Sequence, residues 1–166
     1  MNEKNITIYQ LSNDRRTATK VFPESSKVLC SRSMSYILGN VLTFTVEEMG
    51  EASDGDVIGM ATQHCVIDNK QVLHGAECVG VSSKGVIHVN GTSMTTRLPA
   101  FKRGTQVSFE ANKLSTEKLR VTVSVDNKEV TSDWSLKEAV EKLYFAMCFG
   151  QSGWQVTIGW KNAKLW

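Results

Sequence analysis

The sequence predicts an all-β domain, an antiparallel β-sandwich with one short α-helix. The segments Val41–Glu48 and Leu119–Val125 alternate apolar and polar side chains. A period of two with one apolar face is the pattern of an antiparallel strand that is buried on one side. Between such segments lie turn signals. The strongest is Asn90-Gly91, because both central residues of a type I′ hairpin turn need a positive φ.

Eleven strands are expected along the chain, separated by turn-forming residues. Many short strands at this spacing are typical of sandwiches and barrels. In chain order, the expected strands are Asn5–Gln10, Lys27–Cys30, Val41–Glu48, Val57–Thr62, Glu77–Ser82, Val86–Val89, Gln106–Ala111, Leu119–Val125, Lys128–Thr131, Tyr144–Phe149 and Trp154–Gly159.

A single helix is expected over Ser135–Leu143. Ser135 and Glu138 have the spacing of a capping box. An apolar stripe at helical spacing follows, made by Leu136, Ala139, Val140 and Leu143. A helix this short needs to dock on the sheets, because an isolated helix of this length is marginal in water.

Length and composition favour one domain over residues 1–166. Hydrophobic residues make up 41% and charged residues 22%, and the formal net charge is +2. The basic residues are scattered, so no nucleic-acid partner is expected. No segment approaches the roughly 20 apolar residues of a membrane span, and the polar N-terminus lacks the apolar core of a signal peptide. The sequence therefore predicts a cytoplasmic protein with no membrane partner.

No catalytic, cofactor or metal site is expected. Gly-rich phosphate loops are absent, and Gly150–Gly153 resembles a nucleophile elbow only in part, because Trp154 replaces the glycine. Cys65, His74 and Cys78 lack the usual chelating spacing of zinc ligands, so a zinc site stays an open alternative only. An enzyme is therefore not the expected function.

Two tryptophans lie in or beside predicted loops. Trp134 and Trp154 each allow two interpretations. An exposed tryptophan in a loop is a frequent binding anchor, because it offers a large rigid area at a low entropy cost. A tryptophan that packs between the sheets or against the helix is the other interpretation, and the sequence leaves both open.

The order of elements from Val79 to Ile158 resembles the SPRY (B30.2) domain family. The matching segments are GVSSKGVIHVNG (Gly80–Gly91), GTQVSF (Gly104–Phe109), LRVTVSVDNKEV (Leu119–Val130) and LYFAMCFGQSGWQVTI (Leu143–Ile158). Upstream, VLTFTVEEM and DGDVIGMAT are similar to two further strands of that family. The chain departs from the pattern at Phe145, where the family has proline, and at Thr105, where it has aspartate. The neuralized homology repeat is a close second resemblance.

Both families imply a bent sandwich that binds a peptide or a protein surface through loops at one end, as part of a larger adaptor, ubiquitin-ligase or receptor-type protein. The expected loops are Asn13–Arg16, Ser33–Asn40, Gln63–Gly75, Thr92–Phe101, Asn127–Trp134 and Gly150–Trp154. The side chains expected to contact the partner are Arg16, Tyr36, Asp68, Gln151 and Trp154.

A lectin-like sandwich is the alternative function. It needs an aromatic platform for a sugar ring, or carboxylates and an amide around a calcium ion. The candidates for calcium ligands are Asp54, Asp56 and Asn90.

Overall fold

A computed structural model describes residues 8–23, 28–31, 38–62, 77–140 and 142–159. These residues form strands and connections, with no helix among them, and therefore no helix that could cross a membrane. The strands are β1 (Tyr9–Leu11), β2 (Thr17–Lys20), β3 (Val28–Cys30), β4 (Val41–Glu48), β5 (Val57–Thr62), β6 (Cys78–Ser82), β7 (Val86–Val89), β8 (Thr92–Arg97), β9 (Gln106–Ser115), β10 (Lys118–Val125), β11 (Lys128–Ser135), β12 (Leu143–Cys148) and β13 (Gln155–Gly159).

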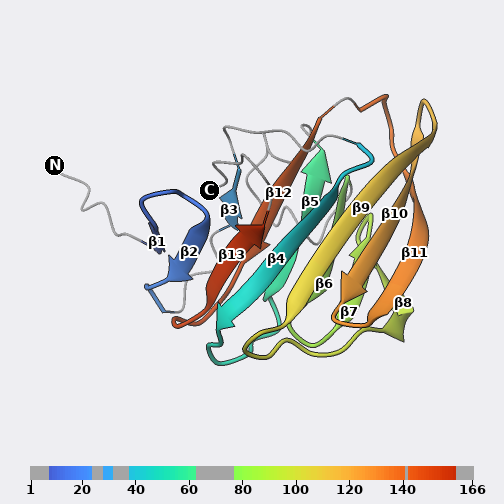
Figure 1. The fold of residues 1–166 in the computed structure, drawn as a ribbon. Coiled ribbons are helices and arrows are strands. Elements are labelled where there is room, and N and C mark those ends of the chain that lie inside the picture. The colour runs from blue at the N-terminus through green and yellow to red at the C-terminus, as the bar shows by residue number, and fades with distance from the viewer. Residues whose placement is uncertain (1–7, 24–27, 32–37, 63–76, 141, 160–166) are drawn as a thin grey trace, which may run out of the picture.

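The strands form two antiparallel sheets that pack face to face (Figure 1). One sheet has the order β1-β2-β13-β4-β9-β10-β11, and the other has the order β3-β12-β5-β6-β7-β8. The inward-facing side chains of both sheets meet in the main apolar core, and a second, smaller apolar cluster lies on β5, β6 and β12. Phe44 lies at the centre of the main core, with its ring edge-on to Phe109 at 5.8 Å and to Phe145 at 6.3 Å between centroids. The predicted all-β sandwich is confirmed.

Every expected strand overlaps an observed one, and two observed strands were not expected. β2 reads Thr-Ala-Thr-Lys and β8 reads Thr-Ser-Met-Thr-Thr-Arg, so neither shows an apolar alternation. β8 lies at the edge of its sheet and is almost entirely exposed, while β2 turns a lysine toward the interior. Residues 5–7 and 27 of the expected strands lie outside the described residues.

The prediction of a helix over Ser135–Leu143 is wrong for the described part of that segment. Ser135 is the last residue of β11 and pairs with Lys118 on β10. The Leu136 N–H donates to the Glu117 carbonyl at 2.8 Å, and the Lys137 N–H donates to the Glu77 carboxylate at 2.9 Å. Ser135 is therefore extended where a helix cap was expected, and the next two residues are held by other segments in a non-helical connection. The apolar stripe still reaches the core, because Leu136 and Val140 are buried.

A candidate interaction surface at one end of the sandwich

The connection between β12 and β13, residues Phe149–Trp154, is called the 149–154 loop. It meets the C-terminal ends of β2 and β4, and Figure 1 shows these segments gathered at the lower left. The Lys20 N–H donates to the Trp154 carbonyl at 2.8 Å, and the Gly153 N–H donates to the Lys20 carbonyl at 2.9 Å. The end of β2 therefore holds the loop by its backbone.

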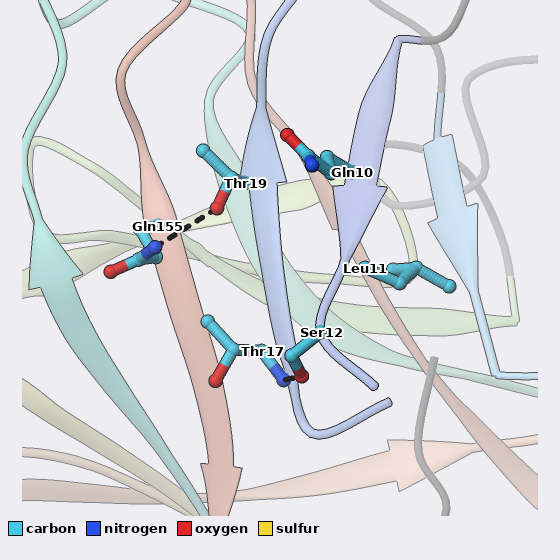
Figure 2. Close-up of a pocket in the computed structure, with 6 residues that line it drawn as sticks. All are labelled: Gln10, Leu11, Ser12, Thr17, Thr19 and Gln155. Carbon is cyan, nitrogen blue, oxygen red and sulfur yellow. Dashed lines mark hydrogen bonds between the residues drawn. The ribbon is translucent and has the colours of Figure 1, made fainter. Parts of the chain in front are cut away.

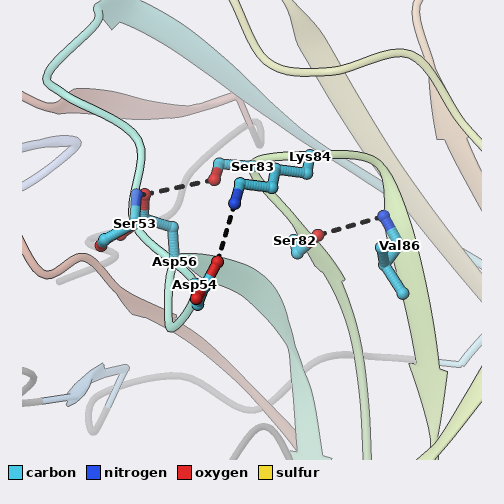
Figure 3. Close-up of polar contacts among 7 residues, drawn as sticks. All are labelled: Ser53, Asp54, Asp56, Ser82, Ser83, Lys84 and Val86. Atoms are coloured by element: carbon cyan, nitrogen blue, oxygen red, sulfur yellow. Dashed lines mark hydrogen bonds and ion pairs between the residues drawn. The ribbon is translucent and has the colours of Figure 1, made fainter.

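A buried carboxylate holds the loop from the other side. Asp56 is fully buried, and its side chain accepts the Gly150 N–H at 2.9 Å. The same carboxylate accepts the N–H and the hydroxyl of Ser53 at 2.7 and 2.6 Å, and the Ser83 hydroxyl at 3.2 Å (Figure 3). Asp56 thus links the β4–β5 connection, the β6–β7 turn and the 149–154 loop. Hydrogen bonds to an ionised acceptor are among the stronger ones in proteins.

A buried ammonium group completes the attachment. Lys20 Nζ donates to the Phe149 carbonyl at 2.8 Å and to the Gly150 carbonyl at 3.4 Å, and it lies 5.7 Å from the centre of the Tyr9 ring. Burial lowers the pKa of Lys20, and the nearby Cys148 and Asp56 oppose that effect. The Tyr9 hydroxyl accepts the Phe149 N–H at 3.2 Å. Two residues that the sequence did not single out, Lys20 and Tyr9, therefore fix the first turn of the loop.

Trp154 closes the loop from inside and does not reach the surface. Its side chain is fully buried, stacked on Phe149 at 4.7 Å and edge-on to Phe101 at 6.4 Å between centroids. The indole N–H donates to the Glu51 carbonyl at 3.1 Å. A Cβ on Gly50 would collide with the Trp154 ring and the Ser152 carbonyl, so only glycine fits there. The prediction that Trp154 is an exposed anchor for a partner is wrong. Its side chain instead packs inside the domain, as the other interpretation of the sequence expected.

The other predicted contact residues do not come together at one end. Gln151 lies in the 149–154 loop before β13 and is half-buried. Arg16 lies at the opposite end of β13, where its carbonyl accepts the Ile158 N–H at 2.9 Å. Tyr36 and Asp68 lie outside the described residues. Within the described part, a surface at one end can include Gln151 or Arg16, but not both.

The calcium ligands considered for a lectin are also separated. The Asp56 carboxylate is engaged as described above, and Asp54 forms an exposed ion pair with Lys84 at 2.7 Å (Figure 3). Asn90 lies at the far end of β7, where its Oδ1 accepts the Trp134 indole N–H at 2.8 Å. Cys65 and His74 lie outside the described residues. The residues that are described hold no group of three His, Cys, Asp or Glu side chains placed to bind a metal ion.

A pocket of about 270 Å³ opens on the outer face of β1, β2 and β13 (Figure 2). Thr17 and Thr19 alternate with buried neighbours and so point away from the core. The Gln155 amide donates to the Thr19 hydroxyl at 3.0 Å. The lining is uncharged and contains no aromatic ring; it consists of Gln10, Leu11, Ser12, Thr17, Thr19 and Gln155. Without a ring that stacks on a sugar, this pocket lends the lectin-like alternative no support.

Sequence comparison gives a close match over most of the chain. The model of the CRLF3 C-terminal domain family matches residues 10–159. Cytokine receptor-like factor 3 from Homo sapiens is 39% identical over 160 residues, and the protein of that name from Xenopus laevis is 33% identical over 159 residues. Each match covers 90% of this chain and 36% of the relative, so the chain spans about a third of the length of these relatives.

Structural comparison identifies the fold. A human SPRY domain superposes with a TM-score of 0.70 at 13% identity, covering 92% of this chain and 94% of that domain. The neuralized homology repeat domain of Neuralized from Drosophila melanogaster gives a TM-score of 0.51 at 11% identity, covering 92% and 85%. The resemblance to the SPRY fold, with the neuralized homology repeat as a second structural match, is confirmed.

Proposed function

Because the chain belongs to the CRLF3 C-terminal domain family, we propose that it is a non-catalytic module that binds a peptide or a protein surface through the end of the sandwich that carries the 149–154 loop. We further propose that it works in the cytoplasm as one domain of a larger adaptor, ubiquitin-ligase or receptor-type protein. The length of the relatives supports the place in a larger protein, and their name favours the receptor-type alternative.

The observation that best supports this proposal is how the 149–154 loop is held in place. Its backbone is fixed by β2, by the Asp56 carboxylate and by the Lys20 ammonium group, while Ser152 and Gly153 remain exposed at its tip. A loop that is ordered before binding loses little conformational entropy on binding, so more of the contact energy appears as affinity. A rigid frame with its contacts on loops is also the common arrangement of binding domains.

The inward-facing polar groups at this end hold the 149–154 loop in place, which favours a structural role for them over a catalytic one. The Asp56 carboxylate accepts four hydrogen bonds from neighbouring backbone and hydroxyl groups. Lys20 points its ammonium group at carbonyls of the loop and not at open surface. These charges therefore support the proposal that the loop serves recognition, with no reaction at this end of the domain.

Ser152→Arg tests the proposal. A long cationic side chain at the loop tip should block a partner, while the exposed side chain of Ser152 leaves room for it without disturbing the core. We expect proteins cross-linked to the wild-type chain in a cell extract to be depleted on the order of tenfold with Ser152→Arg, as for a central contact residue. Quantitative mass spectrometry of the captured proteins measures this.

Thr95→Arg is the matched control, because Thr95 is exposed on the edge strand β8, outside the loop end. It should capture the same proteins as the wild-type chain. Equal capture by all three chains would contradict the proposed surface.

A further inference from the structure

Exposed apolar side chains gather on both sides of the 149–154 loop. Val21 and Phe22 follow β2 and are each 39% exposed, and Met49 follows β4 and is 48% exposed. Large apolar side chains with this exposure are few in the described residues, and the two others are Val41 at the start of β4 and Leu114 on β9. A cluster of exposed apolar side chains is more informative than single ones, because scattered cases are normal on protein surfaces.

The backbone segments that carry these three residues lie on either side of the tip of the 149–154 loop. Gly153 pairs with Lys20, directly before Val21. On its other side, a Cβ on Gly153 would lie 4.0 Å from the Met49 carbonyl. The tip Ser152–Gly153 therefore lies between the end of β2 and the end of β4. Gly153 has a φ of +99°, a conformation that favours glycine at the tip of the loop.

Three acidic residues lie close to Met49 in the sequence. Glu47, Glu48 and Glu51 are exposed around Met49. Glu48 lies 3.5 Å from Arg103, and both side chains are more than half exposed, so solvent screens that pair. The loop tip itself is uncharged, and the ammonium group of Lys20 is buried beneath it. Exposed carboxylates thus lie before and after Met49 in the chain, next to an uncharged loop tip.

We propose that this surface, defined as Val21, Phe22, Met49 and Gln151–Gly153, binds an extended peptide segment whose apolar side chain is flanked by lysine or arginine. The inference rests on the proposed function and adds the chemistry of the partner. An apolar side chain of the partner would pack among Phe22 and the adaptable side chain of Met49. Its basic neighbours would meet the three glutamates, which favours association and sets the direction of the peptide.

Selection from a displayed library of random 12-residue peptides on the immobilised chain tests this. We expect enriched peptides to carry an apolar residue next to lysine or arginine. Fluorescence polarisation should show that Met49→Lys weakens their binding on the order of tenfold or more. Glu51→Lys should weaken it too, and the affinity should fall as salt rises, because screening reduces charge attraction between exposed groups.

Val41→Lys is the matched control, since Val41 is 53% exposed at the other end of the same strand. It should leave the affinity unchanged. If the selected peptides are neutral or acidic and Met49→Lys still weakens their binding, the proposed partner chemistry is wrong while the proposed function stands. Peptides that bind Met49→Lys as well as the wild type would overturn the surface. A selection that enriches no peptide would count against both the inference and peptide binding by this domain.

Discussion

Asp56→Ala is expected to lower the free energy of unfolding by roughly 3–5 kcal/mol, a large part of the 5–15 kcal/mol that stabilises an average domain. The change removes the acceptor of four hydrogen bonds from Gly150, Ser53 and Ser83. These donors lie in the interior or partly buried, so each loses a partner that water does not fully replace. Urea denaturation of the wild-type and variant chains measures the difference.

Two matched variants sharpen this experiment. Asp56→Asn keeps one acceptor oxygen and the shape of the side chain, so its loss should be smaller. Asp54→Ala changes the neighbouring carboxylate, which forms only an exposed pair with Lys84, and should change the midpoint little. If Asp56→Ala were no less stable than Asp54→Ala, the carboxylate would not be what holds the three connections together.

Trp154→Ala is expected to cost about 3–5 kcal/mol and to release the 149–154 loop. The substitution leaves a cavity beside Phe149 and Phe101 and removes the hydrogen bond to the Glu51 carbonyl. The Gly153 amide, which donates to the Lys20 carbonyl, should then exchange its proton with solvent much faster. Thermal unfolding measures the first effect, and hydrogen exchange resolved by residue measures the second.

Trp134→Ala separates loss of stability from release of the loop. Trp134 is equally buried, but its indole N–H donates to Asn90 at the other end of the domain. Its loss should destabilise the sandwich by a comparable amount while Gly150 and Gly153 keep their protection in the folded state. If exchange at these two amides were the same in both variants, packing of Trp154 would not be the reason that the loop is ordered.

Strands such as β4 and β10 were predictable because their sequences alternate apolar and polar side chains. β5 and β6 are buried on both faces and appear in the sequence as short apolar runs between turn residues. Two strands show the limits of the alternation signal. β4 has the bounds that its alternation predicts, Val41–Glu48. β11 continues past its expected end at Thr131 to Ser135, because β10 offers pairing partners along its whole length. The same pairing with β10 removes the start of the expected helix. Local sequence signals for a cap and an apolar stripe therefore gave way to contacts with a neighbouring strand.

The candidate site was only partly predictable. The position of the 149–154 loop follows from the two strands beside it, and Gln151 lies in it as expected. Asp56, however, looks like an ordinary turn carboxylate in the sequence, and Lys20 looks like a surface residue. Their burial depends on segments distant in the sequence that meet at this end, among them Ser83 and Gly150. Trp154 lies beside a predicted loop in the sequence, and its burial depends on stacking with Phe149.

The central claim is that a partner binds around the tip of the 149–154 loop. Backbone amide chemical shifts, followed while the tightest peptide from the selection is added, test it most directly. The account predicts that the shifts that change belong to residues 20–22, 47–51 and 150–153, at one end of the sandwich. Changes that cluster around Arg16 at the opposite end, or at the neutral pocket beside Gln10, would contradict it.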